Sequence, residues 1–167
     1  MGAFVVSSGF EAFELARQHE SRGDDYTGII IKSLADRFAE ALAEWAHQKL
    51  RWALGTENRD FPLTHGDLLE EKYKVIRPAP GYAACPVHND KGLIWNLLEV
   101  KEKLGAQLTE NFAMDPPGTV AAWVIANPES HYFSVGHIGH DQFQSYIQFK
   151  KWTPEIGKKW LGSVYKL

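Results

Sequence analysis

The chain has 167 residues, 44% of them hydrophobic, and a formal net charge of -3, so it is long and apolar enough to fold as one domain around its own core. Its acidic and basic residues are interspersed and create no positive field for a phosphate backbone, which argues against nucleic acid as a partner. The single cysteine excludes an internal disulfide, and without a basic leader or a run of about 20 apolar residues we expect a cytoplasmic protein that does not enter a membrane.

Helices are predicted for the first part of the chain. A short helix is expected over residues 11–18, and residues 22–25 then break it and offer an N-cap to the next element. One long helix should follow over residues 26–54 and end at Gly55. The evidence for it is a stripe of large apolar residues at intervals of three to five positions, as on one face of a helix: Ile30, Leu34, Phe38, Leu42, Trp45 and Leu50.

A shorter helix, capped by Thr64 and Asp67, is predicted next, followed by a stretch over residues 77–86 that cannot be regular. Three prolines and Gly81 force this stretch into an extended, turning path. Its backbone amides and carbonyls are not consumed by a helix or a sheet, so we expect them to be free for a ligand.

The second half should combine helices and strands. A helix over residues 90–104 is expected to stop at Gly105, and two closing helices are expected over residues 141–150 and after Thr153-Pro154. Strands are predicted where β-branched and aromatic residues gather, over residues 108–114, 119–126 and 132–138. A hairpin turn at residues 127–130 should join the last two strands. The order of elements favours an α+β fold in which a twisted antiparallel sheet is flanked by helices, one of them long.

One motif goes beyond composition. Arg77-Pro78-Ala79-Pro80-Gly81-Tyr82, continued by Ala83-Ala84-Cys85-Pro86 and His88, resembles the signature loop of the S-adenosylmethionine-binding activation domain of cobalamin-dependent methionine synthase. The resemblance extends along nearly the whole chain, for example through Lys32-Ser33-Leu34-Ala35-Asp36-Arg37-Phe38-Ala39-Glu40-Ala41 and Leu108-Thr109-Glu110. It implies a single domain over residues 1–167 that makes up most of an activation domain and lacks its N-terminal part.

The resemblance also implies a ligand site. Arg77 has a planar guanidinium that suits a carboxylate, and we assign it the methionyl carboxylate of S-adenosylmethionine. The backbone around Ala79, Gly81 and Tyr82 would read the adenine edge, with Gly81 permitting close approach. Tyr132 and Phe133 would form an aromatic wall of the site. Glu40 and Glu71 would place two carboxylates near the sulfonium.

The implied activity is the reactivation of methionine synthase, in which cob(II)alamin is reduced by one electron and methylated by S-adenosylmethionine. Cobalamin would be held by a partner module, and a reduced flavodoxin or a flavoprotein reductase would donate the electron. The chain would act as part of a methyltransferase and would not make methionine alone. The task is to position the ligand, so no catalytic side chain is expected.

Other interpretations remain. A non-catalytic module could keep the fold and dock a cobalamin-binding partner without binding S-adenosylmethionine, or a small S-adenosylmethionine protein could act in trans. His137 and His140 could suggest a metal site, but on a strand they would point to opposite faces, so no metal is expected. Cys85 and His88 could form a thiol and imidazole pair, although no third group orients them for hydrolysis.

Overall fold

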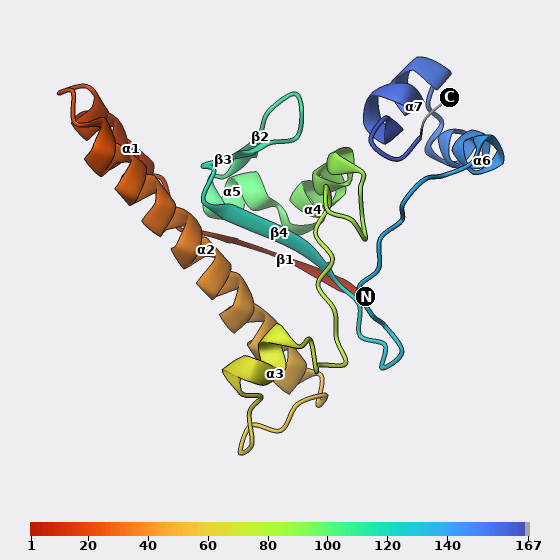
Figure 1. Ribbon diagram of the computed structural model, residues 1–167, viewed down its shortest axis with the longest axis horizontal. Helices are drawn as coiled ribbons and strands as arrows, with labels where there is room; N and C mark the ends of the chain where they lie inside the picture. Colours follow the sequence, from red (N-terminus) through yellow and green to blue (C-terminus); the bar gives the residue numbers. More distant parts are fainter. Residues whose placement is uncertain (166–167) are drawn as a thin grey trace.

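The computed structural model describes residues 1–165, and its centre is an antiparallel sheet (Figure 1). Strand β1 (Gly2–Ser7) pairs with β4 (Thr119–Val124) in a register that runs from Gly2 opposite Val124 to Ser7 opposite Thr119. Residues 76–78 lie along the other side of β4, because Ile76 bridges Ile125 and the Trp123 amide donates to the Pro78 carbonyl at 3.0 Å. The motif segment therefore begins as part of the sheet.

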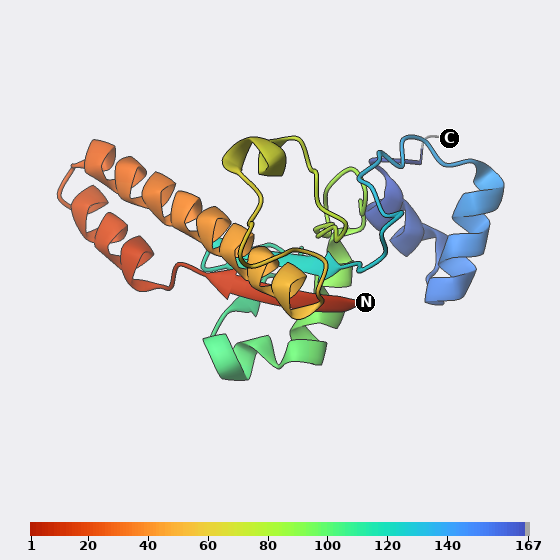
Figure 2. The ribbon, with the colours of Figure 1, turned by 90° about the horizontal axis from the view of Figure 1, so that it is seen from below.

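Helices cover both faces of this sheet (Figure 2). Helix α2 (Asp25–Ala53) packs on one face, and α4 (Lys91–Leu98) with α5 (Val100–Leu104) packs on the other. Side chains alternate between the two faces along each strand. The α2 side receives Phe4, Val6, Val120, Ala122 and Val124, and the α4 side receives Ala3, Val5, Ala121 and Trp123. The predicted α+β class is confirmed.

The long helix is confirmed almost to the residue, and α1 (Glu11–Glu20) packs against it. Asp24 caps α2 by accepting the Thr27 amide at 3.2 Å. The apolar stripe noted in the sequence nevertheless does not form the core contact: Phe38 is 69% exposed and Trp45 is 55% exposed. The small residues Ala35, Ala39 and Ala43 are buried instead, because only short side chains fit where the helix lies close to the sheet.

In two other predicted helices, local backbone geometry sets where the helix begins or ends. Helix α3 (His65–Leu69) has the capping box predicted at Thr64 and Asp67. The helix predicted over residues 90–104 is interrupted, because Glu99 has a left-handed conformation with φ of 52° that ends α4 before α5 begins. A short 3-10 turn, η1 (His88–Asp90), precedes α4, and Gly105 ends α5 with φ of 71°.

The strand predictions were correct only for residues 119–126, where β4 lies. Strand β1 was not anticipated. The strand predicted over residues 108–114 is a small hairpin, in which β2 (Gln107–Leu108) pairs with β3 (Met114–Asp115). The strand over residues 132–138 was wrong: β1 and residues 76–78 already occupy both sides of β4, so this segment runs as an extended connection. The predicted turn at residues 127–130 does form, because the Ser130 amide donates to the Asn127 carbonyl at 3.0 Å, but it leads into this connection and not into a hairpin strand.

The C-terminal helices form a second small core. Helices α6 (His140–Lys150) and α7 (Pro154–Leu161) were both predicted, and Thr153 caps α7 through the Ile156 amide. Their core includes Val87 from the loop before α4. The other buried residues of this core come from α6, α7 and the residues after α7: Phe143, Ile147, Leu161, Val164 and Tyr165. Within residues 1–165, no helix combines the length and the hydropathy that a membrane span requires.

Candidate functional site

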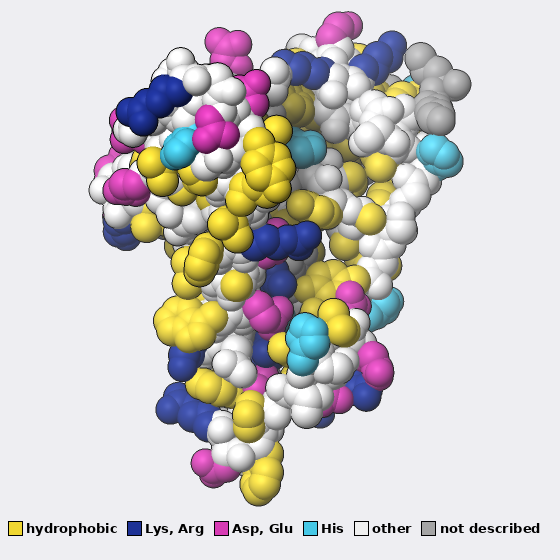
Figure 3. Space-filling view, turned by 60° about the vertical axis from the view of Figure 1, so that its left-hand side comes forward, with side chains coloured by type: hydrophobic (Ala, Val, Ile, Leu, Met, Phe, Trp, Pro, Cys, Tyr) yellow, Lys and Arg dark blue, Asp and Glu magenta, His cyan; other side chains and the backbone are white. Residues whose placement is uncertain are grey.

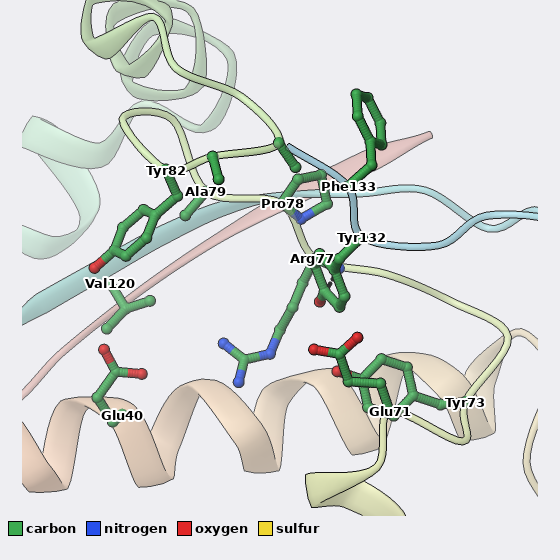
Figure 4. Close-up of a pocket in the computed structure, with 12 residues that line it drawn as sticks. Glu40, Glu71, Tyr73, Arg77, Pro78, Ala79, Tyr82, Val120, Tyr132 and Phe133 are labelled. Atoms are coloured by element: carbon green, nitrogen blue, oxygen red, sulfur yellow. Dashed lines mark hydrogen bonds between the residues drawn. The ribbon is translucent and has the colours of Figure 1, made fainter. Parts of the chain in front are cut away.

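A cavity of about 430 Å³ lies between α2, the motif loop and the connection after β4 (Figure 4). Seven of the eight residues proposed from the sequence line it: Glu40, Glu71, Arg77, Ala79, Tyr82, Tyr132 and Phe133. The eighth, Gly81, lines an adjoining hollow of about 230 Å³ that also touches Glu40, Ala79 and Tyr82. Residues separated by up to 93 positions in the chain thus meet around one space.

Arg77 is placed by the sheet and oriented by α2. Its backbone amide donates to the Tyr132 hydroxyl at 2.9 Å, and its guanidinium donates through Nη2 to Glu44 Oε2 at 3.1 Å. The side chain is 22% exposed, and Figure 4 shows it descending from the loop toward α2, between Glu40 and Glu71. Its buried Nε has no partner within residues 1–165, so a donor remains available beside the cavity.

Behind Arg77, charged side chains of alternating sign extend away from the cavity. Glu44 also accepts from Arg51 Nη1 at 3.4 Å, and Arg51 Nε donates to Glu57 at 2.6 Å. Arg51 is 1% exposed and Glu57 is 4% exposed. Burial acts to raise the pKa of Glu57, but the hydrogen bond and charge of Arg51 outweigh it and hold that pKa low. Charges of both signs therefore balance each other within this buried row.

Aromatic rings close the cavity on the side of residue 132. The Tyr132 and Tyr73 rings meet edge to face at 6.5 Å, and Tyr73 meets the His47 ring at 5.0 Å. His47 Nε2 bonds the Val75 carbonyl at 2.8 Å, which requires a proton on that nitrogen. Burial, together with the charges of Arg51 and Arg77, lowers the pKa of His47 to about 4, so the ring is neutral at pH 7.

Gly81 is required by the packing of the loop itself. Its φ is 103°, which side chains disfavour, and a Cβ at this position would lie 2.5 Å from the His88 ring. The space that the missing side chain leaves is therefore occupied by His88 and not by a ligand. Lys91 donates to His88 Nδ1 at 3.0 Å and to the Phe112 carbonyl at 3.1 Å, which fixes the imidazole in place.

The loop backbone is less free than its prolines suggest. Several of its groups are already paired: the Gly81 amide donates to the Cys85 carbonyl at 2.7 Å, the Tyr82 amide donates to the Ala79 carbonyl at 3.2 Å, the Cys85 amide donates to the Tyr82 carbonyl at 2.9 Å, and the Pro78 carbonyl accepts from β4. In the part of the chain that the structure describes, the Ala79 amide and the Gly81 carbonyl have no hydrogen-bond partner. One donor and one acceptor, two positions apart, thus remain available.

The two acidic candidates reach the cavity from different elements. Glu40 projects from α2 next to Val120, and Glu71 follows α3 on a residue with φ of 53°. Both side chains belong to exposed residues, so their charges face solvent as well as the cavity. The cavity therefore presents one guanidinium, two carboxylates, aromatic rings and unpaired backbone groups.

The alternative chemistries receive little support from the geometry. Burial raises the pKa of Cys85, which disfavours a thiolate, and burial with the Lys91 charge lowers the pKa of His88. His137 lies in the extended connection and His140 begins α6. Among residues 1–165, no group of three or more His, Cys, Asp or Glu side chains is arranged to hold a metal ion.

Sequence reasoning missed two residues that matter to the site. Glu44, the partner of Arg77, lies one helical turn after Glu40, and that i, i+4 spacing on one helix was a signal that it faces the same way. Tyr73, which lines the cavity, carries no comparable pattern: it follows α3 in an irregular segment, and only the fold brings it beside Tyr132.

Comparisons with known proteins agree with this arrangement. A family model described as "Vitamin B12 dependent methionine synthase, activation domain" matches residues 1–151. A crystal structure of the MetH reactivation domain bound to AdoHcy superimposes with a TM-score of 0.90 at 41% sequence identity, over 99% of this chain and 51% of that one. The chain thus spans about half the length of that solved relative. It belongs to the family of activation domains of vitamin B12-dependent methionine synthase.

Proposed function

We propose that the cavity beside Arg77 binds S-adenosylmethionine (AdoMet). The observation that carries this proposal is the convergence of seven predicted residues on one space, whose volume of about 430 Å³ is within the range of small-molecule sites. The solved relative was crystallised with AdoHcy, the product that AdoMet becomes when it loses its methyl group, so a ligand of this class suits the family.

The free groups of the cavity complement AdoMet. Arg77 Nε and its guanidinium plane would hold the methionyl carboxylate with charge-assisted hydrogen bonds. The Ala79 amide and the Gly81 carbonyl offer a donor and an acceptor for the adenine edge, which presents both kinds of group. Glu40 and Glu71 would favour the positive sulfonium. Tyr132 would supply the adjoining aromatic surface, with Phe133 at the rim.

In this proposal the side chains bind and orient, and none acts as a nucleophile. AdoMet, when bound, supplies a methyl group on a positively charged sulfur. The chain would present that ligand to a cobalamin-binding module during reactivation in the cytoplasm, with a flavodoxin or flavoprotein reductase as the electron donor. We further propose that residues 1–167 fold as one domain and form only part of an activation domain, since the matched chain is about twice as long.

Calorimetric titration with AdoMet and AdoHcy tests the site. We expect binding by the wild type and a loss of about ten- to a hundredfold in affinity for Arg77→Lys, because hydrogen bonds to a charged group contribute roughly 1.5–3 kcal/mol and the ammonium lacks the planar fork. This change keeps the positive charge beside Glu44. Arg17→Lys, an exposed arginine on α1, is the matched control and should bind like the wild type.

Thermal melts would establish that each variant is folded. A folded wild type that gives no heat with millimolar AdoMet, and matches Arg77→Lys in this respect, would refute the ligand site. The alternative of a docking module without a ligand would then be favoured, because the Arg77 guanidinium already has an internal partner in Glu44.

A further inference from the structure

Helix α2 is apolar on two opposite faces. The small residues that face the sheet are buried, and a second set of large residues faces away from it, each between 38% and 69% exposed. We call this second set the outer face of α2: Ile30, Leu34, Phe38, Leu42 and Trp45. A surface helix normally turns polar residues to water, whereas a helix that is apolar all round is normally buried on all sides.

The outer face is continuous with a groove. Helix α1 contributes Ala12 and Leu15, which together with Leu34, Phe38 and Leu42 line a depression of about 380 Å³ between the two helices. Figure 3 shows hydrophobic side chains distributed along this side of the molecule. Two exposed cations accompany them by helical spacing, because Arg37 follows Leu34 by three positions and Lys49 follows Trp45 by four.

The exposed area is at the upper end for a soluble monomer. Taking about 200 Å² for each fully exposed large side chain, the five residues expose about 500 Å². The largest apolar patch of a soluble monomer is about 300–600 Å² and often marks a binding surface. Other exposed apolar side chains, such as Leu69 and Phe149, lie on different elements.

The relative supplies a candidate for what covers this face. Its alignment accounts for 99% of this chain but for only 51% of its own length, so about half of the relative has no counterpart among these residues. At a TM-score of 0.90, its α2 equivalent lies in the same setting on the sheet. The outer face of α2 and its adjoining groove form an apolar surface that this second half can cover.

We propose that the outer face of α2 docks the polypeptide that corresponds to this unaligned half of the MetH reactivation domain, whether joined to this chain or separate. The partner surface is an apolar helical face flanked by carboxylates that meet Arg37 and Lys49. The groove between α1 and α2 receives its largest side chains. This surface is separate from the cavity beside Arg77, so docking is independent of the AdoMet proposal.

Coexpression tests the proposal. The 167-residue chain, carrying an affinity tag, is coexpressed with the unaligned half of the solved MetH reactivation domain, and the purified material is analysed by light scattering without any ligand. We expect a 1:1 complex. Phe38→Glu should weaken it at least about tenfold, because docking would bury an unpaired carboxylate. Phe149→Glu is the matched control, since it changes an exposed phenylalanine on another helix, and the complex should persist.

Three results would overturn the proposal: failure of the second polypeptide to copurify with the tagged chain when the two are coexpressed, a complex that survives Phe38→Glu, or a homodimer of the chain alone that Phe38→Glu dissociates. The last would make a second copy the occupant. Because no AdoMet is present, failure of the Arg77 titration would leave this result standing, and the reverse also holds.

Discussion

At the scale of single residues, the position of Arg77 depends on groups that never reach the cavity. Glu44 holds its guanidinium, Arg51 and Glu57 hold Glu44, and the neutral His47 packs beside them. Removing one member of a buried charged group leaves its partner unpaired. The free-energy cost of that unpaired charge exceeds the net stabilisation that the whole group contributes. The same network makes protonation of His47 unfavourable, because a new positive charge would be buried near two arginines.

This gives a prediction for pH. His47 has a folded-state pKa of about 4, well below the unfolded value near 6.5, so the unfolded chain binds the extra proton between these values. Its contribution to stability is complete above about pH 6.5 and is lost as the pH falls toward 4, by up to about 3 kcal/mol. Urea unfolding at pH 7.5 and pH 5 should show a smaller loss for His47→Gln than for the wild type. Equal losses would contradict the prediction.

The sequence predicted most of the residues that surround the cavity, but not how they contact one another. A specific motif identified Arg77 and the loop, and the family resemblance supplied Glu40. The sequence could not reveal that Gly81 makes room for His88, because that contact depends on how the loop folds back on itself. Nor could it show which backbone groups stay free, since the pairing of Gly81 with Cys85 is a tertiary outcome.

At the scale of elements, periodicity predicted helices well and their orientation poorly. The stripe on α2 was a true helical pattern, yet its large residues point away from the sheet because Ala35, Ala39 and Ala43 allow a close approach. Strand β1 contains the short run Phe4-Val5-Val6, which favours a strand but was passed over, and it pairs with β4, more than a hundred residues away. Residues 132–138 had strand composition, but both edges of β4, the strand they would have paired with in a hairpin, were already occupied.

The break between α4 and α5 is also set by a local backbone conformation, and this can be tested. Glu99 adopts φ of 52°, a conformation that costs a side-chain-bearing residue about 1 kcal/mol and glycine almost nothing. Glu99→Gly should therefore raise the free energy of unfolding by about 0.5–1 kcal/mol, despite the loss of an exposed ion pair with Lys103. Chemical denaturation measures this change.

Glu102→Gly provides the contrast, because Glu102 lies within α5. Glycine there should lower stability by up to about 1 kcal/mol. If both glycines destabilise to the same extent, the left-handed conformation of Glu99 does not control the break.

At the scale of the whole molecule, the described residues form a layered sheet core, with one apolar cluster on each face, and a smaller core at the C-terminal helices. Helices α6 and α7 with Val87 form this smaller core. Besides Val87, the links between the two include the Val135 amide that donates to the Ala83 carbonyl, the pair of Lys150 and Asp90 at 2.6 Å, and the edge-to-face contact of the Phe112 and Trp160 rings at 5.3 Å. The first two links contact the Arg77 loop and the residues just after it, so the C-terminal core supports the far side of that loop.

The ion pair between Asp90 and Lys150 should couple the two cores. Its side chains are only 17% and 18% exposed, so solvent screens them weakly, and a double-mutant cycle with Asp90→Asn and Lys150→Met should give a coupling of about 1–3 kcal/mol. The exposed pair of Glu99 and Lys103, with side chains 65% and 64% exposed, is the control and should give less than about 0.5 kcal/mol. Tryptophans in both cores, Trp95 and Trp152 among them, allow fluorescence to follow unfolding. If one domain is present, fluorescence and circular dichroism should report a single transition in the wild type, whereas a coupling near zero would mean that α6 and α7 unfold without affecting the sheet.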